Sequence, residues 1–181
     1  MTENLNIGKD VDGKDDQNDD TIIERYCYNN DTTKCDEFGG LYQWAEMMQL
    51  PSRCNTESCA DLIETNHQGI CPDGWRLFTV RDFDVVLRGE GNKDSMKGLK
   101  SSLFSGFNTT GFSLVGAGSR SADGKFEKLH ETAYWFYPSE YILDINIYAS
   151  SGQTSALIND LPGDSGSTKK RGFPVRCVMV E

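Results

Sequence analysis

Apolar residues are sparse over the first twenty positions and then recur in short groups that predict secondary structure. Residues 8–20, GKDVDGKDDQNDD, are almost all polar or acidic, which predicts a loop or a mobile insert. The β-branched and aromatic run 21–28, TIIERYCY, predicts a strand. Residues 41–50 carry apolar side chains at helical spacing and end before Pro51, so we predict a helix with one side in the core. That side would consist of Leu41, Trp44, Ala45 and Met48.

A second helix is predicted over residues 79–88. Thr79 and Asp82 have the spacing of a capping box, with Asp in the place usually taken by Glu or Gln, and Gly89 would end the helix. The sequence that follows is rich in Gly and Ser and predicts loops up to about residue 110. The inner face of the helix would be formed by Val80, Phe83 and Leu87.

The second half of the chain has the pattern of a β structure. Asp123 and Gly124 stand between two apolar runs, which predicts a hairpin turn, and residues 150–170 form a long polar stretch. Further strands are predicted over residues 134–137, 141–148 and 173–180. Because helices come early and strands come late, the pattern predicts an α+β fold.

Length and charge narrow the classes of function. The 181 residues predict one domain, 1–181, which is long enough to bury a core. The formal net charge of −10 and the short basic run 169–171 disfavour nucleic-acid binding, because phosphates must be neutralised by basic patches. No apolar run approaches the roughly 20 residues of a membrane span, so direct membrane insertion is not expected.

The six cysteines predict a disulfide-stapled domain from an oxidising compartment. Many pairings are possible, but the local spacing favours Cys27–Cys35 and Cys54–Cys59. This choice leaves Cys71–Cys177 as the third bridge.

Metal ligation is the alternative role for these cysteines. The cysteine spacings and the two histidines fit no zinc-ligand pattern. The acidic segment 8–20 does not fit an EF-hand, because Lys14 and Asp15 would take the fifth and sixth positions of a calcium loop that begins at Asp10. We therefore predict no metal site, and we expect the segment to be a solvated loop.

Five segments resemble the Fibrobacter succinogenes major paralogous domain. They are ENLNIG (3–8), YCYNND (26–31), CDEFGGLYQWAEMMQLP (35–51), HQGICPDGW (67–75) and GFPVRCV (172–178). The resemblance implies a C-type-lectin-like fold related to formylglycine-generating enzymes, with two helices around a small, twisted, mostly antiparallel sheet with long loops. It also implies an extracellular or cell-surface bacterial protein. Members of the family usually begin with a tryptophan just before the stretch that corresponds to residues 1–5, so the resemblance implies that the chain could be a fragment of a longer surface protein.

The chain departs from the family in two places. Residues 74–79 read GWRLFT where members commonly have GWHLPT, and residues 135–140 read WFYPSE where members have a tryptophan-serine-serine run. Both changes lie near the strands that the resemblance implies for ligand binding. They argue against a ligand shared by the whole family.

No catalytic constellation accompanies the resemblance. Formylglycine-generating enzymes use a pair of reactive cysteines near the C-terminus, whereas Cys177 stands alone there and resembles the structural cysteine of the relatives. The calcium-dependent sugar motifs of C-type lectins, Glu-Pro-Asn or Gln-Pro-Asp followed by Trp-Asn-Asp, do not occur in the sequence. We therefore expect a protein that is not an enzyme and that needs no cofactor.

The aromatic stretch 134–148, YWFYPSEYILDINIY, is the best candidate for ligand binding. Neighbouring side chains of a strand point to opposite faces, so some of its aromatic rings could be exposed and suit carbohydrate or protein recognition, although burial is the commoner state for any one ring. The best exposed candidates are Tyr137, Tyr141 and Tyr148. Polar contacts would come from Asp144, Asn146, Ser150 and Asn159, and His130 could join them.

These observations predict a non-catalytic extracellular module for ligand binding or adhesion. It would bind a glycan, a polysaccharide or a surface protein through residues 134–170. The alternatives are a structural spacer or assembly subunit without a ligand of its own and, with less support, an enzyme with an unfamiliar site. An exposed aromatic patch would favour the binding module, and an apolar contact face or open sheet edge would favour the spacer or assembly subunit. A cleft with perturbed titratable groups would favour an enzyme.

Overall fold

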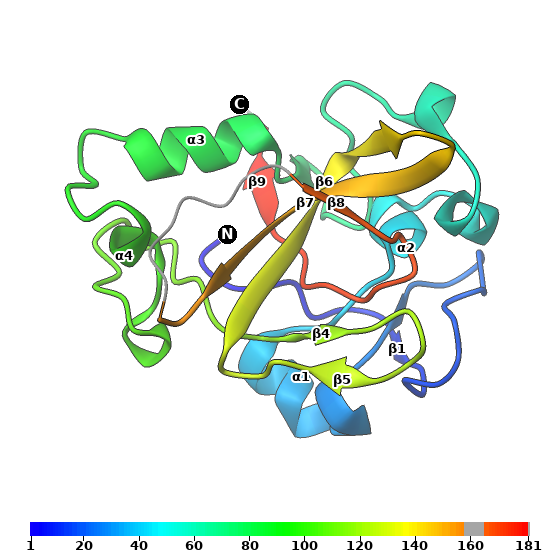
Figure 1. Cartoon of the computed structure of the whole chain (residues 1–181), viewed down its shortest axis with the longest axis horizontal. Helices are drawn as coiled ribbons and strands as arrows, with labels where there is room; N and C mark the ends of the chain where they lie inside the picture. The colour runs from blue at the N-terminus through cyan, green and yellow to red at the C-terminus, as the bar shows by residue number, and fades with distance from the viewer. Residues whose placement is uncertain (158–164, 181) are drawn as a thin grey trace.

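Short helices and small, mostly antiparallel sheets make up the protein, which confirms the predicted α+β class (Figure 1). The computed structural model describes residues 1–157 and 165–180. The helices are α1 (Thr32–Phe38), α2 (Trp44–Met48), α3 (Val80–Arg88) and α4 (Met96–Leu99), with 3-10 helices at Tyr28–Asn30, Ser52–Asn55, Ala60–Leu62 and Ser102–Phe104. The strands are β1 (Lys9–Asp10), β2 (Glu24–Arg25), β3 (Trp75–Leu77), β4 (Ser119–Arg120), β5 (Phe126–Glu127), β6 (Thr132–Leu143), β7 (Asn146–Ser155), β8 (Ser165–Ser167) and β9 (Cys177–Met179).

The largest sheet has the order β6-β7-β8 and is antiparallel throughout. The register of β6 against β7 shifts between Phe136 and Glu140, where an irregularity contains Pro138. β3 pairs with β9 and β4 with β5 in antiparallel fashion, whereas β1 and β2 form a parallel pair. Figure 1 shows the long β6–β7 pair crossing the middle of the molecule, between the α3–α4 region and α2.

β6 lies between two clusters of buried apolar residues. Phe136 belongs to the cluster around α2, and its ring centroid lies 4.3 Å from that of Phe173. Trp135 and Tyr137 point the other way into the cluster around α3, where Trp135 stacks on Phe83 at 5.3 Å. Because β6 is covered on both faces here, this part of the aromatic stretch forms core rather than surface.

The two predicted helices are present, and both differ in detail from the prediction. Of the segment 41–50, only Trp44–Met48 is helical, because Leu41 and Tyr42 are extended and form isolated bridges with Tyr26 and Phe173. The predicted core side is confirmed: Leu41, Trp44, Ala45 and Met48 are all buried.

The second predicted helix corresponds to α3. The capping box of Thr79 and Asp82 is confirmed, since each side chain accepts a hydrogen bond from the other residue's backbone N–H. Phe83 and Leu87 are buried, but Val80 is 38% exposed, so its predicted place on the inner face is wrong. The first turn is held by the cap and by the ion pair of Arg76 with Asp82 rather than by apolar packing.

Several predicted strands are shorter in the structure. The segment 21–28 contains only Glu24–Arg25 as a strand. Thr21 is held in a turn, because its backbone N–H and its hydroxyl both donate hydrogen bonds to the carboxylate of Asp19. The segment 173–180 contains the strand Cys177–Met179, preceded by buried residues. The Asp123-Gly124 turn does join two antiparallel strands, β4 and β5, as predicted.

The acidic segment 8–20 is largely exposed and irregular, as a solvated loop would be, but Gly13 and Gln17 are buried and fasten it to the body of the protein. The buried guanidinium of Arg120 donates hydrogen bonds to the carbonyl oxygens of Gly13 and Asp15 and lies over the ring of Tyr26 at 4.6 Å. Gln17 is 1% exposed and bonds to both the backbone and the side chain of other segments. A buried cation therefore fixes a stretch that its composition alone marks as solvated.

The three predicted disulfides, Cys27–Cys35, Cys54–Cys59 and Cys71–Cys177, are all present. The last of these spans 106 positions and joins Cys71, which precedes β3, to Cys177 in β9. Three intact disulfides indicate a domain that folds outside the reducing cytoplasm. Within residues 1–157 and 165–180, no helix has the length and apolar character needed to cross a membrane.

Candidate functional site

Among the described residues of the predicted binding region, the end of the β6–β7 hairpin carries several exposed side chains. Tyr141 lies directly opposite Tyr148, and Leu143 lies opposite Asn146. Because side chains alternate along a strand, these four residues share one face of the sheet. Gly166 of β8 lies next to them: a Cβ atom at Gly166 would come within 2.6 Å of Tyr141 Cδ1, so the tyrosine ring covers the glycine backbone.

The hairpin ends in an exposed apolar tip. Ile145 is 93% exposed, Ile142 62% and Leu143 52%, and Tyr141 is 38% exposed beside them. Asp144 makes the turn with a positive φ of 54°, a conformation that Asp tolerates better than most residues. We call Tyr141, Ile142, Leu143 and Ile145 the hairpin tip. Leu143 shares the face of Tyr141, whereas Ile142 lies on the opposite face, so the tip presents exposed apolar side chains on both sides of the turn. Several exposed apolar side chains close together are typical of binding sites, whereas isolated ones are common everywhere.

The predicted site residues fall into three groups. Tyr141, Asp144, Asn146 and Tyr148 lie together at the hairpin end. Tyr137 and Ser150 are buried, at 3% and 5% exposure, so the predictions that they are open to a ligand are wrong. The reasons are that Tyr137 joins the core cluster around α3 and that Ser150 lies in the middle strand of the sheet. Asn159 lies outside the described residues.

His130 does not join this group. It precedes β6 at the end opposite to the hairpin tip, and its ring packs edge-on against Phe38 of α1 at 5.2 Å.

A buried ion pair fastens the hairpin end to the rest of the protein. Lys169 Nζ lies 2.5 Å from Glu140 Oε1, and both side chains are almost fully buried. The same ammonium donates to the carbonyl oxygen of Cys54 and lies 4.3 Å from the ring centroid of Trp44. Glu140 also accepts hydrogen bonds from the backbone N–H of Cys59 and the hydroxyl of Ser58. Strand β6, the Cys54–Cys59 loop and the C-terminal segment thus meet at one charged pair.

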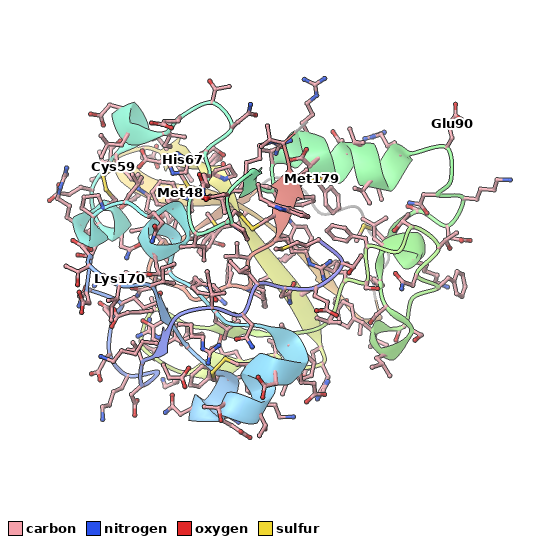
Figure 2. The ribbon with its side chains drawn as sticks, turned by 180° about the vertical axis from the view of Figure 1, so that it is seen from behind. Met48, Cys59, His67, Glu90, Lys170 and Met179 are labelled. Carbon is pink, nitrogen blue, oxygen red and sulfur yellow. A yellow bond between two sulfur atoms is a disulfide. The ribbon has the colours of Figure 1, made fainter. Side chains whose placement is uncertain are left out.

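The protonation of this pair follows from its contacts. Burial alone would raise the pKa of Glu140, but the hydrogen bonds from Cys59, Lys169 and Ser58 outweigh burial and hold the pKa of Glu140 below its usual value. The carboxylate is therefore charged over the neutral pH range. Figure 2 places Cys59, next to this pair, at the end of the molecule opposite Glu90.

Reasoning from the sequence missed the aliphatic half of the tip and its anchor. The single strand predicted over 141–148 is wrong, since β6 ends at Leu143 and β7 begins at Asn146. The alternation of apolar and polar residues continues through the turn, and no Gly marks it. Glu140 and Lys169 are separated by 29 positions, and no local pattern pairs them. The Pro138 that interrupts the aromatic run was the one available signal of an irregular strand.

The described residues contain one group of potential metal ligands, Asp10 with Cys27 and Cys35. The two sulfur atoms of that group are joined in a disulfide, so neither can act as a thiolate ligand. This part of the chain therefore gives no support to a metal centre built on its cysteines.

Comparisons with known proteins identify the family. No curated protein and no solved structure matches the chain at the significance required. The model of the Fibrobacter succinogenes major domain matches residues 1–179, nearly the whole sequence. This chain therefore belongs to the Fibrobacter succinogenes major domain family.

Proposed function

We propose that this protein is a non-catalytic extracellular binding module that attaches to a protein on the bacterial surface through its hairpin tip. The observation that carries the proposal is the exposure of three neighbouring aliphatic side chains at the end of a rigidly anchored hairpin. Leaving such a cluster in water is unfavourable, and a partner that covered it would gain the free energy of apolar burial.

The composition of the tip favours a protein over a glycan. Tyr141 and Tyr148 would suit either ligand, since aromatic rings contact both sugar faces and protein side chains. Ile142, Leu143 and Ile145 offer no hydrogen bonds to sugar hydroxyl groups but can fill an apolar pocket on a protein. Asp144 and Asn146 would supply polar contacts at the rim of such an interface.

The extracellular location and the lectin-like fold are parts of the same proposal. Three disulfides are the support for an extracellular location, since such bonds persist in oxidising compartments. The support for a C-type-lectin-like fold is an antiparallel sheet flanked by α2 and α3, together with long irregular segments. The absence of a catalytic function remains an expectation from the sequence.

Binding to bacterial envelope fragments tests the proposed function. Labelled wild-type protein should bind them, and Ile145→Ser should weaken binding by about tenfold, because a residue at the centre of an interface contributes on the order of 1.4 kcal/mol. Val85→Ser is a matched control, since Val85 is also exposed, at 64%, but lies on α3. It should bind like the wild type.

Treatment of the fragments separates the possible ligands. Protease should abolish binding, whereas periodate oxidation of sugars should leave it intact. Equal binding by Ile145→Ser and the wild type would rule out the hairpin tip as the site, and loss of binding only after periodate would indicate a glycan. If sedimentation instead shows self-association that Ile145→Ser abolishes, the tip serves assembly, and the alternative of an assembly subunit is favoured.

A further inference from the structure

A second surface feature, far from the hairpin tip, is a groove between α1 and residues 101–116. It consists of two adjoining cavities of about 400 Å³ and 240 Å³. Glu37, Phe38 and Val115 line both cavities, so the two adjoin each other. Together they have the size of a site for a small ligand. In Figure 1, α1 lies away from the free end of the β6–β7 hairpin, so the groove is separate from the proposed partner site.

The larger cavity is lined by a buried cation, Arg176, on which the carboxylate of Glu3 acts without forming an ion pair in the described structure. Arg176 is 6% exposed, and its guanidinium donates to Asn4 Oδ1 at 2.8 Å, to the carbonyl oxygen of Ser113 at 2.9 Å and to that of Phe112. All three acceptors are neutral, and no described carboxylate forms an ion pair with Arg176. Burial lowers the pKa of Arg176 to about 10, which reflects the cost of holding this charge away from water.

The guanidinium retains capacity for an anionic ligand. It carries five N–H groups in a planar fork that matches a carboxylate, and three of them are used in the bonds above. The remaining two make no hydrogen bond among the described residues, and Arg176 lines the larger cavity. A carboxylate would supply both the missing charge and the missing acceptors.

The rim of the same cavity carries negative charge. Glu3 and Asp36 line it, both are exposed, and neither forms an ion pair with a described basic residue. Glu37 also lines it but is paired with Lys34. A simple anion would be repelled by these carboxylates, whereas a ligand that carries an ammonium group as well would be attracted to them.

The smaller cavity is apolar and holds an unsatisfied hydroxyl. Phe38, Phe104 and Val115 line it, and Leu103 stands at its edge with 94% of its surface exposed. Ser101 also lines this cavity, and its Oγ is buried with no hydrogen-bond partner in the described structure. An apolar side chain would fill this space, and a peptide group next to it could satisfy the hydroxyl.

We propose that this groove binds a short peptide with free ends and an apolar C-terminal residue. The peptide carboxylate contacts Arg176, and its ammonium group faces Glu3 and Asp36. Its apolar side chain occupies the smaller cavity between Phe38 and Leu103. The ligand chemistry follows from three features of the groove: a buried cation, an acidic rim and an apolar cavity.

NMR titration with alanyl-leucine tests the proposal. Adding the dipeptide to ¹⁵N-labelled protein should shift the amide signals of Phe38, Ser101 and Val115, whereas those of the hairpin tip should stay in place. The C-terminal amide of alanyl-leucine should bind at least tenfold more weakly, because it lacks the charge that pairs with Arg176. N-acetyl-alanyl-leucine should also bind more weakly, because it lacks the ammonium group.

Two exposed positions allow the groove to be altered without unfolding the protein. Leu103→Ser and Asp36→Asn should each reduce the affinity for alanyl-leucine several-fold, and Val85→Ser should leave it unchanged. Equal affinity for the dipeptide and its amide would overturn the proposal, as would shifts confined to other parts of the protein or no shifts at the solubility limit. Each of these results is independent of binding at the hairpin tip, which Ile145→Ser tests.

Discussion

Four basic side chains are buried among the described residues, and they connect segments that are distant in the sequence. They are Lys100, Arg120, Lys169 and Arg176. Each donates hydrogen bonds to backbone carbonyl groups, so the charged ends replace water with fixed dipoles of the protein. Composition alone places such residues at the surface. This is why the docking of segment 8–20 onto Arg120 could not be predicted from the sequence.

Negative charge on the partly buried Glu46 of α2 is unfavourable to the folded protein. Its carboxylate accepts a hydrogen bond from the backbone N–H of Glu24 at 2.9 Å, and Glu24 itself is only 7% exposed. Burial, together with the charges of Glu24 and Asp20, raises the pKa of Glu46 to about 7. A carboxyl group whose pKa is raised on folding favours the folded state only while it is protonated.

We therefore predict that Glu46→Gln stabilises the protein above pH 7. The glutamine keeps an acceptor for Glu24 N–H and removes the unfavourable charge. The wild type should lose stability as pH rises from about 4.5 to about 7, because the unfolded carboxyl ionises first. Urea unfolding at pH 8 should show a gain of about 1–2 kcal/mol after allowance for partial exposure, and no gain at pH 4.

The exposed Glu64 provides the control for this effect of charge. Glu64→Gln removes the same net charge and should change stability little at either pH. A gain for Glu46→Gln that is the same at pH 4 and pH 8 would mean that the carboxylate is not destabilising in the folded protein.

At the scale of elements, local signals predicted some features well and long-range contacts decided the others. The Thr79 capping box and the Asp123-Gly124 turn depend on residues close in sequence, and both were predictable. The same holds for the two short disulfides. The turn at Asp144 was not predictable, because Ile145 follows it and alternation continues through the turn as it would in one strand.

The candidate site shows the same division. Alternation along the predicted single strand 141–148 would place Tyr141 and Tyr148 on opposite faces, whereas the turn at Asp144 brings them opposite each other on one face of the sheet. The burial of Tyr137 depends on α3, which lies about fifty positions earlier and supplies Phe83 to the same cluster. No pattern within residues 134–148 contains that information.

The pair of Glu140 and Lys169 should control the stability of the hairpin end. Glu140→Gln leaves a buried ammonium without its counter-charge and should cost about 2–4 kcal/mol, since two carbonyl acceptors remain for Lys169. Adding Lys169→Met should recover part of that loss, because the unpaired charge is then removed. Urea unfolding of the two single variants and the double variant gives the coupling energy directly. Losses that simply add would show that the two residues act independently.

At the scale of the whole molecule, the C-terminal segment connects regions from both ends of the chain. β9 pairs with β3 and carries Cys177, which is bonded to Cys71. The N-terminal segment also lies along it, since Leu5 N–H donates to the carbonyl oxygen of Val175 at 2.8 Å. The long disulfide therefore holds together three segments, whereas Cys54–Cys59 closes a loop of five positions beside the hairpin end.

Removing each of these bridges should have a different effect. The double variant Cys71→Ala, Cys177→Ala should lose about 4–5 kcal/mol of stability, and Cys54→Ala, Cys59→Ala about 2 kcal/mol, because a longer closed loop restricts the unfolded chain more. Guanidinium unfolding measures both losses. Hydrogen exchange should then show faster opening of β9 and the N-terminal segment in the first variant.

The second variant should loosen a different part of the protein. Cys54 and Cys59 supply a carbonyl group to Lys169 and an N–H group to Glu140, so their release should speed hydrogen exchange at the hairpin end and weaken partner binding there. The peptide groove near α1 should be unaffected, because none of its lining comes from that loop. Equal stability losses in the two variants, with exchange changes spread over the whole chain, would mean that the bridges act through the unfolded state alone and not on these separate regions.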